Sequence, residues 1–267
     1  MSFSAAWLGL REPYDRRARD IAVIDAAVAT LAGRPSVTIA DLACGTGSTF
    51  RALSPRIECR QNWRLIDNDL SLLARTPQSN SPKVTVATVP TDLNLDLEAA
   101  LDGPVDLVTT SALLDLVSDE WLDRLVVETA VRRLPVYAAL SYDGRIQLDP
   151  SDPADGKIVA AVNAHQRTDK GFGPALGPAA ARTAVERFER VDYSVTQGKS
   201  DWVFAVDDRD IQLEMLSGWA AAARDIGDIP LSDIAAWLKR RRDLVTARRS
   251  LMRVGHVDLL ARPTATR

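Results

Sequence analysis

The sequence predicts an α/β fold in which a mostly parallel sheet carries helices on both faces. Apolar runs alternate with helix-like segments in the first half of the chain, and the first run ends in a glycine-rich turn. Strands separated by helices imply right-handed crossovers, which place successive strands in one parallel sheet. The chain has 267 residues, 46% of them apolar, which is enough for one large domain with a sizeable core.

Strands and helices are expected to alternate as far as Tyr142. The first strand, Val37–Ala43, leads directly into the glycine turn. Ser118 is expected to cap a later helix, because a serine hydroxyl accepts a backbone N–H of the first turn. The further strands are Trp63–Asp67, Val84–Val89, Val105–Thr110 and Val136–Tyr142, and the helices between them are Thr49–Leu53, Leu70–Ala74, Leu95–Leu101 and Glu120–Arg133.

More helices are expected on both sides of this alternating region. Apolar residues recur at helical spacing from Asp15 to Leu31, which predicts one helix before the first strand. Prolines and glycines between Asp143 and Pro178 predict a loop-rich stretch. The remaining elements are a helix at Ala179–Arg190, a strand at Arg190–Gly198, helices at Asp210–Asp225 and Leu231–Arg249, and a last strand at Arg253–Ala261.

Composition argues against several classes of protein. A formal net charge of −3 disfavours a general nucleic-acid binder with a broad basic face. No apolar run approaches the roughly 18 to 20 residues that span a membrane, and the first residues lack the pattern of a secretory signal, so a cytoplasmic protein is expected. Cys44 and Cys59 cannot build a disulfide framework, and no His, Cys or Asp cluster has ligand spacing, so no metal is expected.

The glycine turn DLACGTG, residues 41–47, is the most informative motif, because a strand that runs into such a turn brings backbone N–H groups to a ligand. A triphosphate-binding loop needs G-x-x-x-x-G-K-[ST], but the Gly-Lys-Ser of this chain lies far away and has Tyr193 in place of the first glycine. A dinucleotide fingerprint needs a third glycine where Phe50 stands. An ordinary turn whose glycines allow positive φ is the remaining alternative.

The stretch DLACGTGS, residues 41–48, and the order of elements over Val37–Tyr142 resemble the class I S-adenosylmethionine-dependent methyltransferases. The resemblance implies a Rossmann-like seven-stranded sheet, mostly parallel, with an added N-terminal helix and a late helical insertion. It also implies S-adenosyl-L-methionine as the cofactor, with Ala43, Gly45 and Gly47 bringing the backbone to its methionine and ribose parts. Asp41 would order the turn and the methionyl amine.

Two acids after the next strands fit the same family. Asp67 ends the second strand, where a carboxylate can accept hydrogen bonds from the ribose hydroxyls, and Asn68 beside it is a candidate for the adenine. Asp92 follows the third strand, where similar methyltransferases bind the adenine amino group, and Leu93 would pack on the ring. Each acid has a plain alternative as the N-cap of the helix that follows it.

The fourth strand ends in SALLDLVS, which resembles the family's loop beneath the transferred methyl group. Ser111 and Ala112 should line the cofactor, and Leu113 or Leu114 the pocket. Asp115 should face the substrate or else cap the next helix. The Asn/Asp-Pro-Pro-aromatic signature of enzymes that methylate DNA adenine or protein glutamine is absent from this loop, which disfavours those substrates.

Basic residues ahead of the first strand are candidates for the carboxylate of the cofactor. In similar enzymes a helix there folds over the cofactor, and a guanidinium can bind a carboxylate through two hydrogen bonds. Arg19 and Arg11 are the candidates, with a solvated basic face as the alternative for each.

Methyl transfer from a sulfonium is a direct displacement, so a general base is needed only when the acceptor is a hydroxyl or a protonated amine. His165 is the candidate base, since an imidazole pKa of about 6.5 suits neutral pH, and its alternative is an ordinary loop histidine. Tyr142 and Asp143 end the fifth strand at the same crevice and are candidates for binding the acceptor. His256 is expected to be structural.

The last predicted helix and the strand after it carry a run of basic residues. A solvated helix face is the expected explanation, and a site for an anionic group of the substrate is the alternative. The late helices either cap the active site or make a contact in a homodimer. The basic residues are Lys239, Arg240, Arg241, Arg242, Arg248, Arg249 and Arg253.

These features predict one methyltransferase domain over residues 1–267, with a helical cover at 1–35, a cofactor-binding core at 36–150 and a substrate side at 151–267. The expected reaction is direct transfer of a methyl group to an oxygen or nitrogen of a small molecule, anionic if the basic residues bind it. The alternatives are a dehydrogenase, a SAM-binding regulatory protein without transferase activity, and an RNA methyltransferase that uses the basic helix. Neither a membrane nor nucleic acid is the expected partner.

Overall fold

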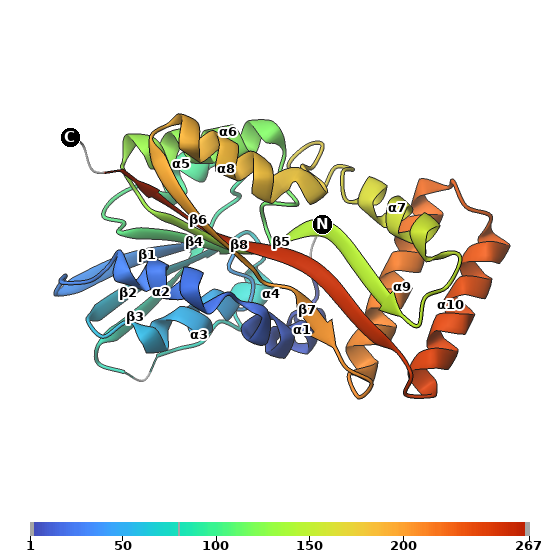
Figure 1. Ribbon diagram of the computed structural model, residues 1–267. Helices are drawn as coiled ribbons and strands as arrows, with labels where there is room; N and C mark the ends of the chain where they lie inside the picture. The colour runs from blue at the N-terminus through green and yellow to red at the C-terminus, as the bar shows by residue number, and fades with distance from the viewer. Residues whose placement is uncertain (1–2, 80, 265–267) are drawn as a thin grey trace.

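In the computed structural model, which describes residues 3–79 and 81–264, the strands form one sheet (Figure 1). They are β1 (Ser36–Leu42), β2 (Arg60–Asp67), β3 (Val84–Pro90), β4 (Leu107–Ser111), β5 (Val136–Asp149), β6 (Tyr193–Lys199), β7 (Trp202–Phe204) and β8 (Leu251–Pro263). Their order is β3-β2-β1-β4-β5-β8-β6, with the short β7 paired to β8. β1 to β5 pair in parallel, and β8 runs antiparallel to β5 and β6. The mostly parallel sheet confirms the predicted fold class, and β7 is an additional strand.

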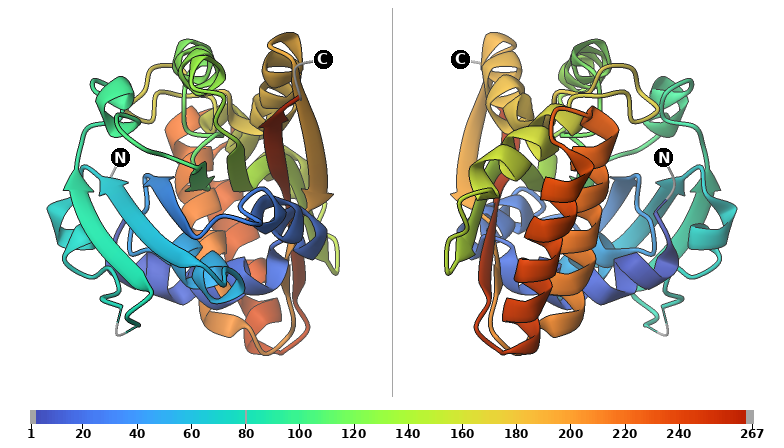
Figure 2. Two further views of the ribbon diagram at one scale, coloured as in Figure 1. Left: turned by 90° about the vertical axis from the view of Figure 1, so that its left-hand side faces the viewer. Right: turned by 90° about the vertical axis from the view of Figure 1, so that its right-hand side faces the viewer.

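Helices cover both faces of the sheet and continue beyond one end of it (Figure 1). One face carries α5 (Leu97–Ala100), α6 (Asp119–Val131) and α8 (Ala180–Arg190), and the other carries α2 (Ile21–Ala29), α3 (Ser48–Leu53) and α4 (Leu70–Leu73), with α1 (Ala5–Ala18) beside them. A third group, α7 (Asp155–His165), α9 (Arg209–Ile226) and α10 (Leu231–Thr246), lies past the sheet, where Figure 2 shows α9 and α10 side by side. No helix in the described part of the chain has the length and apolar character needed to cross a membrane.

The alternation of β1 explains its central place in the sheet. Val37 and Ile39 pack in the hydrophobic cluster that includes α2 and α3, whereas Ala40 and Leu42 pack in the cluster of α5, α6 and α8. Successive side chains of a strand point to opposite faces, so a strand covered on both sides needs apolar residues at nearly every position.

Phe50 stands where a dinucleotide fingerprint has its third glycine, and it belongs to the core. Phe50 is 8% exposed, and its ring lies edge-on to Trp63 of β2, with 5.1 Å between the ring centroids. The first turn of α3 therefore packs on the sheet through a large aromatic contact instead of the close backbone approach that glycine allows.

The prediction of one helix over Asp15–Leu31 is wrong. α1 ends at Ala18, α2 begins at Ile21, and Asp20 between them accepts the backbone N–H of Val23 at 3.0 Å. An aspartate at the N-cap satisfies a donor of the first turn, which favours a new helix at this point.

The predicted loop-rich stretch from Asp143 to Pro178 is wrong in two places. β5 continues to Asp149, paired with the long β8, and the helix α7 follows it. Ile158, Ala161 and Val162 are buried in the cluster shared with α9. Their spacing is that of one helix face, and prolines and glycines on both sides of this short segment obscure the pattern in the sequence.

Six of the seven basic residues near α10 are exposed, so the expected solvated face is confirmed everywhere except at Arg241. Arg241 is fully buried, donates to Pro150 O at 2.6 Å and forms an ion pair with Asp155 of α7. Arg240 donates to Asp152 at 2.6 and 2.9 Å. These contacts attach α10 to the start of α7. Further ion pairs join Lys239 to Asp243, Arg248 to Asp207 and Arg253 to Asp201.

Candidate functional site

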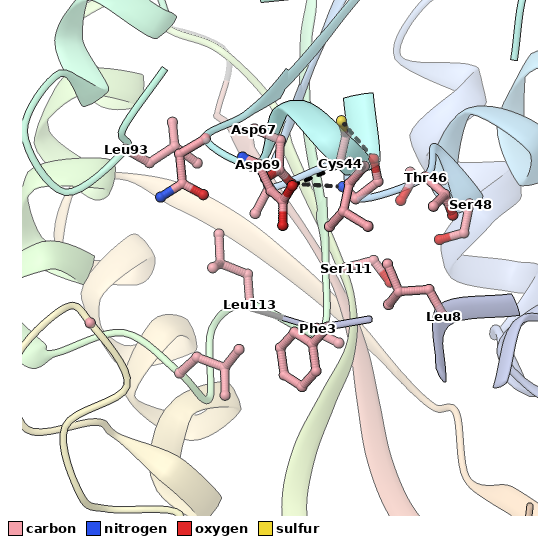
Figure 3. Close-up of a pocket in the computed structure, with 18 of the residues that line it drawn as sticks. Phe3, Leu8, Cys44, Thr46, Ser48, Asp67, Asp69, Leu93, Ser111 and Leu113 are labelled. Atoms are coloured by element: carbon pink, nitrogen blue, oxygen red, sulfur yellow. Dashed lines mark hydrogen bonds between the residues drawn. The ribbon is translucent and has the colours of Figure 1, made fainter. Parts of the chain in front are cut away.

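A cavity of about 200 Å³ opens at the carboxyl ends of β1, β2 and β4. Figure 3 shows Asp67, Leu93, Ser111 and Leu113 around this space together with Phe3. Ala112 also lines it, whereas Leu114 is buried in the core near α6. Of the residues predicted to contact the cofactor, those that line the cavity are Arg11, Ala43, Gly45, Asp67, Asn68, Asp92, Leu93, Ser111 and Ala112.

The turn after β1 is held in shape by the end of β2. Ala43 and Gly45 have φ values of 50° and 54°, a region that side chains disfavour. Gly45 donates its N–H to Asp67 Oδ2 at 2.8 Å. A Cβ on Gly45 would lie 3.1 Å from Leu8 Cδ1, so glycine here also lets α1 approach the turn.

Neither Asp67 nor Asp92 caps a helix, so the capping alternatives are wrong. α4 is capped by Asp69, and α5 begins after Asp96. Asp67 is 9% exposed and its Oδ1 accepts the backbone N–H of Asp69 at 3.0 Å. Both carboxylates lie at the cavity with oxygen lone pairs suited to the hydroxyl or amino groups of a ligand.

Asp41 and Gly47 lie behind the cavity wall instead of lining it. Asp41 is fully buried and accepts the hydroxyl of Thr109 at 2.8 Å, while its Oδ2 has no hydrogen-bond partner among the described residues. Burial raises the pKa of Asp41 to about 7. Gly47 precedes α3 with φ of 84°, and a Cβ there would lie 2.9 Å from Pro77 Cδ, so packing already requires glycine.

Arg19 also reaches the cavity only through its neighbours. It is 4% exposed, and its guanidinium donates to Ser111 Oγ at 3.2 Å and to the hydroxyl of Tyr137 at 3.3 Å. Arg11 lines the cavity, and its Nε donates to Asp15 at 3.0 Å. Of the two arginine candidates, Arg11 is therefore the one within reach of a ligand.

A second cavity of about 380 Å³ adjoins the first and contains the predicted catalytic residues. Asp115, Tyr142 and His165 all line it, although the sequence separates them widely. The two cavities share one wall, whose residues are Phe3, Arg11, Ala112, Leu116 and Lys170.

Asp115 is the buried acid of the second cavity. It is 5% exposed, and Oδ1 accepts the N–H of Tyr142 at 3.4 Å. Burial raises its pKa to about 6, because the carboxylate loses hydration. α6 is capped by Ser118, which accepts the N–H of Trp121 at 3.2 Å. The predicted cap at Ser118 is confirmed, and the capping alternative for Asp115 is wrong.

Tyr142 and Asp143 have different surroundings, although they were expected to share one crevice. The hydroxyl of Tyr142 donates to Asn163 of α7 at 2.7 Å, and burial raises its pKa, so the group is a neutral phenol. Asp143 pairs with Arg145 at 2.7 Å and, within the described chain, lines neither cavity.

His165 lies in the last turn of α7, not in a loop. Its Nδ1 is 3.3 Å from Lys170 Nζ, and its Nε2 is 3.5 Å from Asp225 Oδ2. Burial and the charge of Lys170 lower its pKa. Because both ring nitrogens already contact charged side chains, this imidazole is poorly placed to take a proton from a ligand.

His256 was expected to be structural, and it forms part of the wall of the second cavity. It is 5% exposed, Nδ1 lies 3.1 Å from Val254 O, and burial lowers the pKa to about 4. A carbonyl oxygen only accepts, so Nδ1 carries the proton and the neutral ring keeps an unprotonated Nε2.

The sequence-based interpretation missed the residues that complete the second cavity. Among them, Trp202 comes from β7, and α9 contributes Glu214 and four residues that share one face of the helix. The signal in α9 was helical spacing, since positions i, i+3, i+4 and i+7 share one face of a helix. These α9 residues are Met215, Gly218, Trp219 and Ala222.

The parallel sheet with one antiparallel strand inserted near its edge, and the glycine turn after β1, define the fold of the class I S-adenosylmethionine-dependent methyltransferases. Among solved structures, the chain is similar to a candidate type II methyltransferase from Anaeromyxobacter dehalogenans, with 20% identity, 92% of this chain and 96% of that chain covered, and a TM-score of 0.50. It is also similar to a cyclopropane synthase from Mycobacterium tuberculosis, with 12% identity, 91% and 84% covered, and a TM-score of 0.47. No protein-family model matches the chain, and no match was found among curated proteins. At 20% identity, the likeness to the first of these structures establishes the fold alone.

Proposed function

We propose that this protein is an S-adenosylmethionine-dependent methyltransferase that acts on an oxygen or nitrogen of a small molecule. The pair of adjoining cavities carries the proposal. One cavity lies at the glycine turn with Asp67 and Asp92, the other holds Asp115, and they share a wall. A methyl donor in the first cavity and an acceptor in the second would meet at that wall.

The residues of the first cavity fit the polar groups of S-adenosylmethionine. Asp67 presents a carboxylate beside a glycine, which suits the ribose hydroxyls. Asp92 suits the amino group of adenine and Leu93 the face of its ring. Arg11 suits the carboxylate, because a guanidinium binds such a group through two parallel hydrogen bonds.

Bound S-adenosylmethionine supplies an electrophilic methyl group on a positively charged sulfur. The protein's main contribution is alignment, because a displacement requires the reacting atoms to approach in line. Asp115 is the group we assign to take the proton of an acceptor hydroxyl or amine. It is close in sequence to Ala112 and Leu116 of the shared wall, and above pH 6 or so it is a carboxylate.

Calorimetry followed by isotope transfer tests the proposal. The protein should bind S-adenosylmethionine and its demethylated product but not NAD, and it should move a labelled methyl group from the donor to a component of a metabolite extract. The proposal would be contradicted if the protein bound NAD and did not bind S-adenosylmethionine. Donor binding without any labelled product would indicate a regulatory protein, and label in bulk RNA would indicate an RNA methyltransferase.

A further inference from the structure

We infer that the acceptor is a small planar aromatic or heteroaromatic molecule that carries an ionisable N–H or O–H group and no phosphate. The inference rests on the proposed function, because it names the class of molecule that the second cavity would present to the methyl donor.

One wall of the second cavity is a connected group of aromatic rings from α1, β5, β7 and β8. The ring centroid of Trp202 lies 6.5 Å from that of Trp7 and 4.6 Å from that of His256, and Tyr142 lies 6.0 Å from His256. All four residues line the cavity. An aromatic ligand can continue such a group through stacked or edge-to-face contacts, which add to the free energy gained by burying apolar area.

The polar atoms of this wall are largely occupied by protein partners. Trp202 Nε1 donates to Asp15 at 3.0 Å, the hydroxyl of Tyr142 donates to Asn163 at 2.7 Å, and His256 Nδ1 lies 3.1 Å from a backbone carbonyl. The wall therefore offers mainly ring surface. A ligand with many hydroxyl groups would leave its hydrogen bonds to water without replacing them, which disfavours sugar-like acceptors.

The helix α9 supplies a second wall that leaves room for a flat molecule. Gly218 and Ala222 are small, and a Cβ built on Gly218 would meet no heavy atom within 4 Å. Met215 has a flexible, polarisable side chain that adapts to the edge of a ring. Trp219 extends the aromatic lining to this side.

The charged groups that face the cavity argue against an anionic acceptor. Asp115 lies buried in the wall and Glu214 contributes a second acid from α9. Of the cations in the lining, Arg11 is assigned to the carboxylate of the methyl donor, and Lys170 donates to Thr168 at 2.9 Å. Binding of phosphate favours several convergent cations, and none of the basic residues near α10 lines either cavity in the described chain.

Calorimetry on the complex with the demethylated product tests the inference. The probes are 2-naphthol and 6-aminoquinoline, the saturated counterpart decahydro-2-naphthol, and 2-naphthyl phosphate. We expect at least one of the two aromatic probes to bind. The saturated alcohol should bind about three- to ten-fold more weakly than naphthol, on the scale of an aromatic contact. The phosphate should give no binding heat.

A filling substitution locates the bound probe. Gly218→Leu projects a side chain into the open space of the cavity and should weaken probe binding by about ten-fold or more, with binding of the demethylated product unchanged. Gly156→Leu is the matched control, because Gly156 is also an exposed helical glycine with no heavy atom within 4 Å of its Cβ position, and it lies outside both cavity linings. Leucine is a better helix former than glycine, so both variants should fold.

The outcomes separate the inference from the proposed function. If the wild-type protein does not bind the demethylated product, the proposed function fails. If the product binds but neither aromatic probe does, the inference is overturned and the proposed function stands. The inference is also overturned, and the proposed function stands, if the saturated alcohol or the phosphate binds as tightly as naphthol. A Gly218→Leu variant with unchanged affinity for the probe would have the same meaning.

Discussion

Gly45 donates its backbone N–H to Asp67 Oδ2 at 2.8 Å, and this contact joins the glycine turn to the end of β2. The other carboxylate oxygen of Asp67 accepts the N–H of Asp69 at 3.0 Å. The same side chain therefore shapes the turn and faces the cavity, because each carboxylate oxygen has more than one lone pair.

Asp67→Asn should weaken binding of S-adenosylmethionine by about 1–3 kcal/mol, the scale of a hydrogen bond to a charged group. The amide oxygen can still accept from Gly45, but the NH2 group cannot accept the N–H of Asp69, so the melting temperature should also fall. Calorimetry and thermal unfolding measure the two effects. Asp96→Asn, before α5 and outside the cavity, is the control. Unchanged affinity in the Asp67 variant would remove this residue from the binding site.

Asp115→Asn should lower kcat by about 10²- to 10⁴-fold, the usual contribution of a general base, and should leave the affinity for the methyl donor unchanged. Proton transfer to Asp115 requires the carboxylate, whose pKa is raised to about 6 by burial. The wild-type kcat/KM should therefore decrease as the pH falls through 6, and the variant should lose this limb of the profile. If the decrease in kcat/KM near pH 6 persists in the variant, a group other than Asp115 is the one that titrates.

His165→Ala should keep turnover within about ten-fold of the wild type, since both ring nitrogens already contact charged partners in the protein. Steady-state rates from pH 5 to pH 9 or thereabouts are the measurement. A loss of about 10²-fold or more at all pH values would make His165 the base instead of Asp115.

Asp41 should make the protein less stable as the pH rises from about 4 to about 7. Its pKa is raised from 3.8 to about 7 in the folded state. In that interval the folded state keeps a proton that the unfolded state has released, so raising the pH favours unfolding. The free energy of unfolding of Asp41→Asn relative to the wild type should therefore increase over this interval and level off above it. Urea unfolding across the interval measures the difference, and a constant value would contradict the assignment.

Arg241→Met should lower the free energy of unfolding by about 3–5 kcal/mol, because it leaves Asp155 without its ion-pair partner between α7 and α10. Lys239→Met is the control, since Lys239 is 77% exposed and its pair with Asp243 lies within one helix. The control should change stability by less than about 0.5 kcal/mol. Denaturant unfolding compares the two, and equal effects would show that the buried pair does not hold the helices together.

The sheet could be predicted from sequence because its strands are buried on both faces. Continuous apolar runs such as the one in β1 carry that signal whatever lies around them. The junction of α1 and α2 was less legible, since helical periodicity continues across it and the capping role of Asp20 depends on one side-chain contact. The sequence did not predict α7, because prolines and glycines precede and follow its short apolar stripe.

The sequence predicted the parts of the candidate site in which one motif lies at one strand end, as with Gly45, Asp67 and Asp92. It did not predict the parts in which distant segments meet. Trp7 and Trp202 come together only because β7 pairs with β8 and α1 packs against β7, and no local pattern records those contacts. Arg19 shows that a residue type alone can also mislead. It was a candidate for binding the cofactor, but it is buried and donates to Ser111.

The wall contributed by α9 has an evolutionary consequence. Within the described chain, its lining residues, among them Met215, Gly218 and Trp219, border the second cavity, where we propose that the acceptor binds, and not the cavity of the glycine turn. Substitutions on this helix face can therefore diversify the range of accepted molecules while the machinery for the methyl donor is inherited unchanged. Arg11 and Ala112 border both cavities, so substitutions there would alter the affinity for the methyl donor and the affinity for the acceptor together. New acceptor preferences in descendants of this chain are expected to arise through α9.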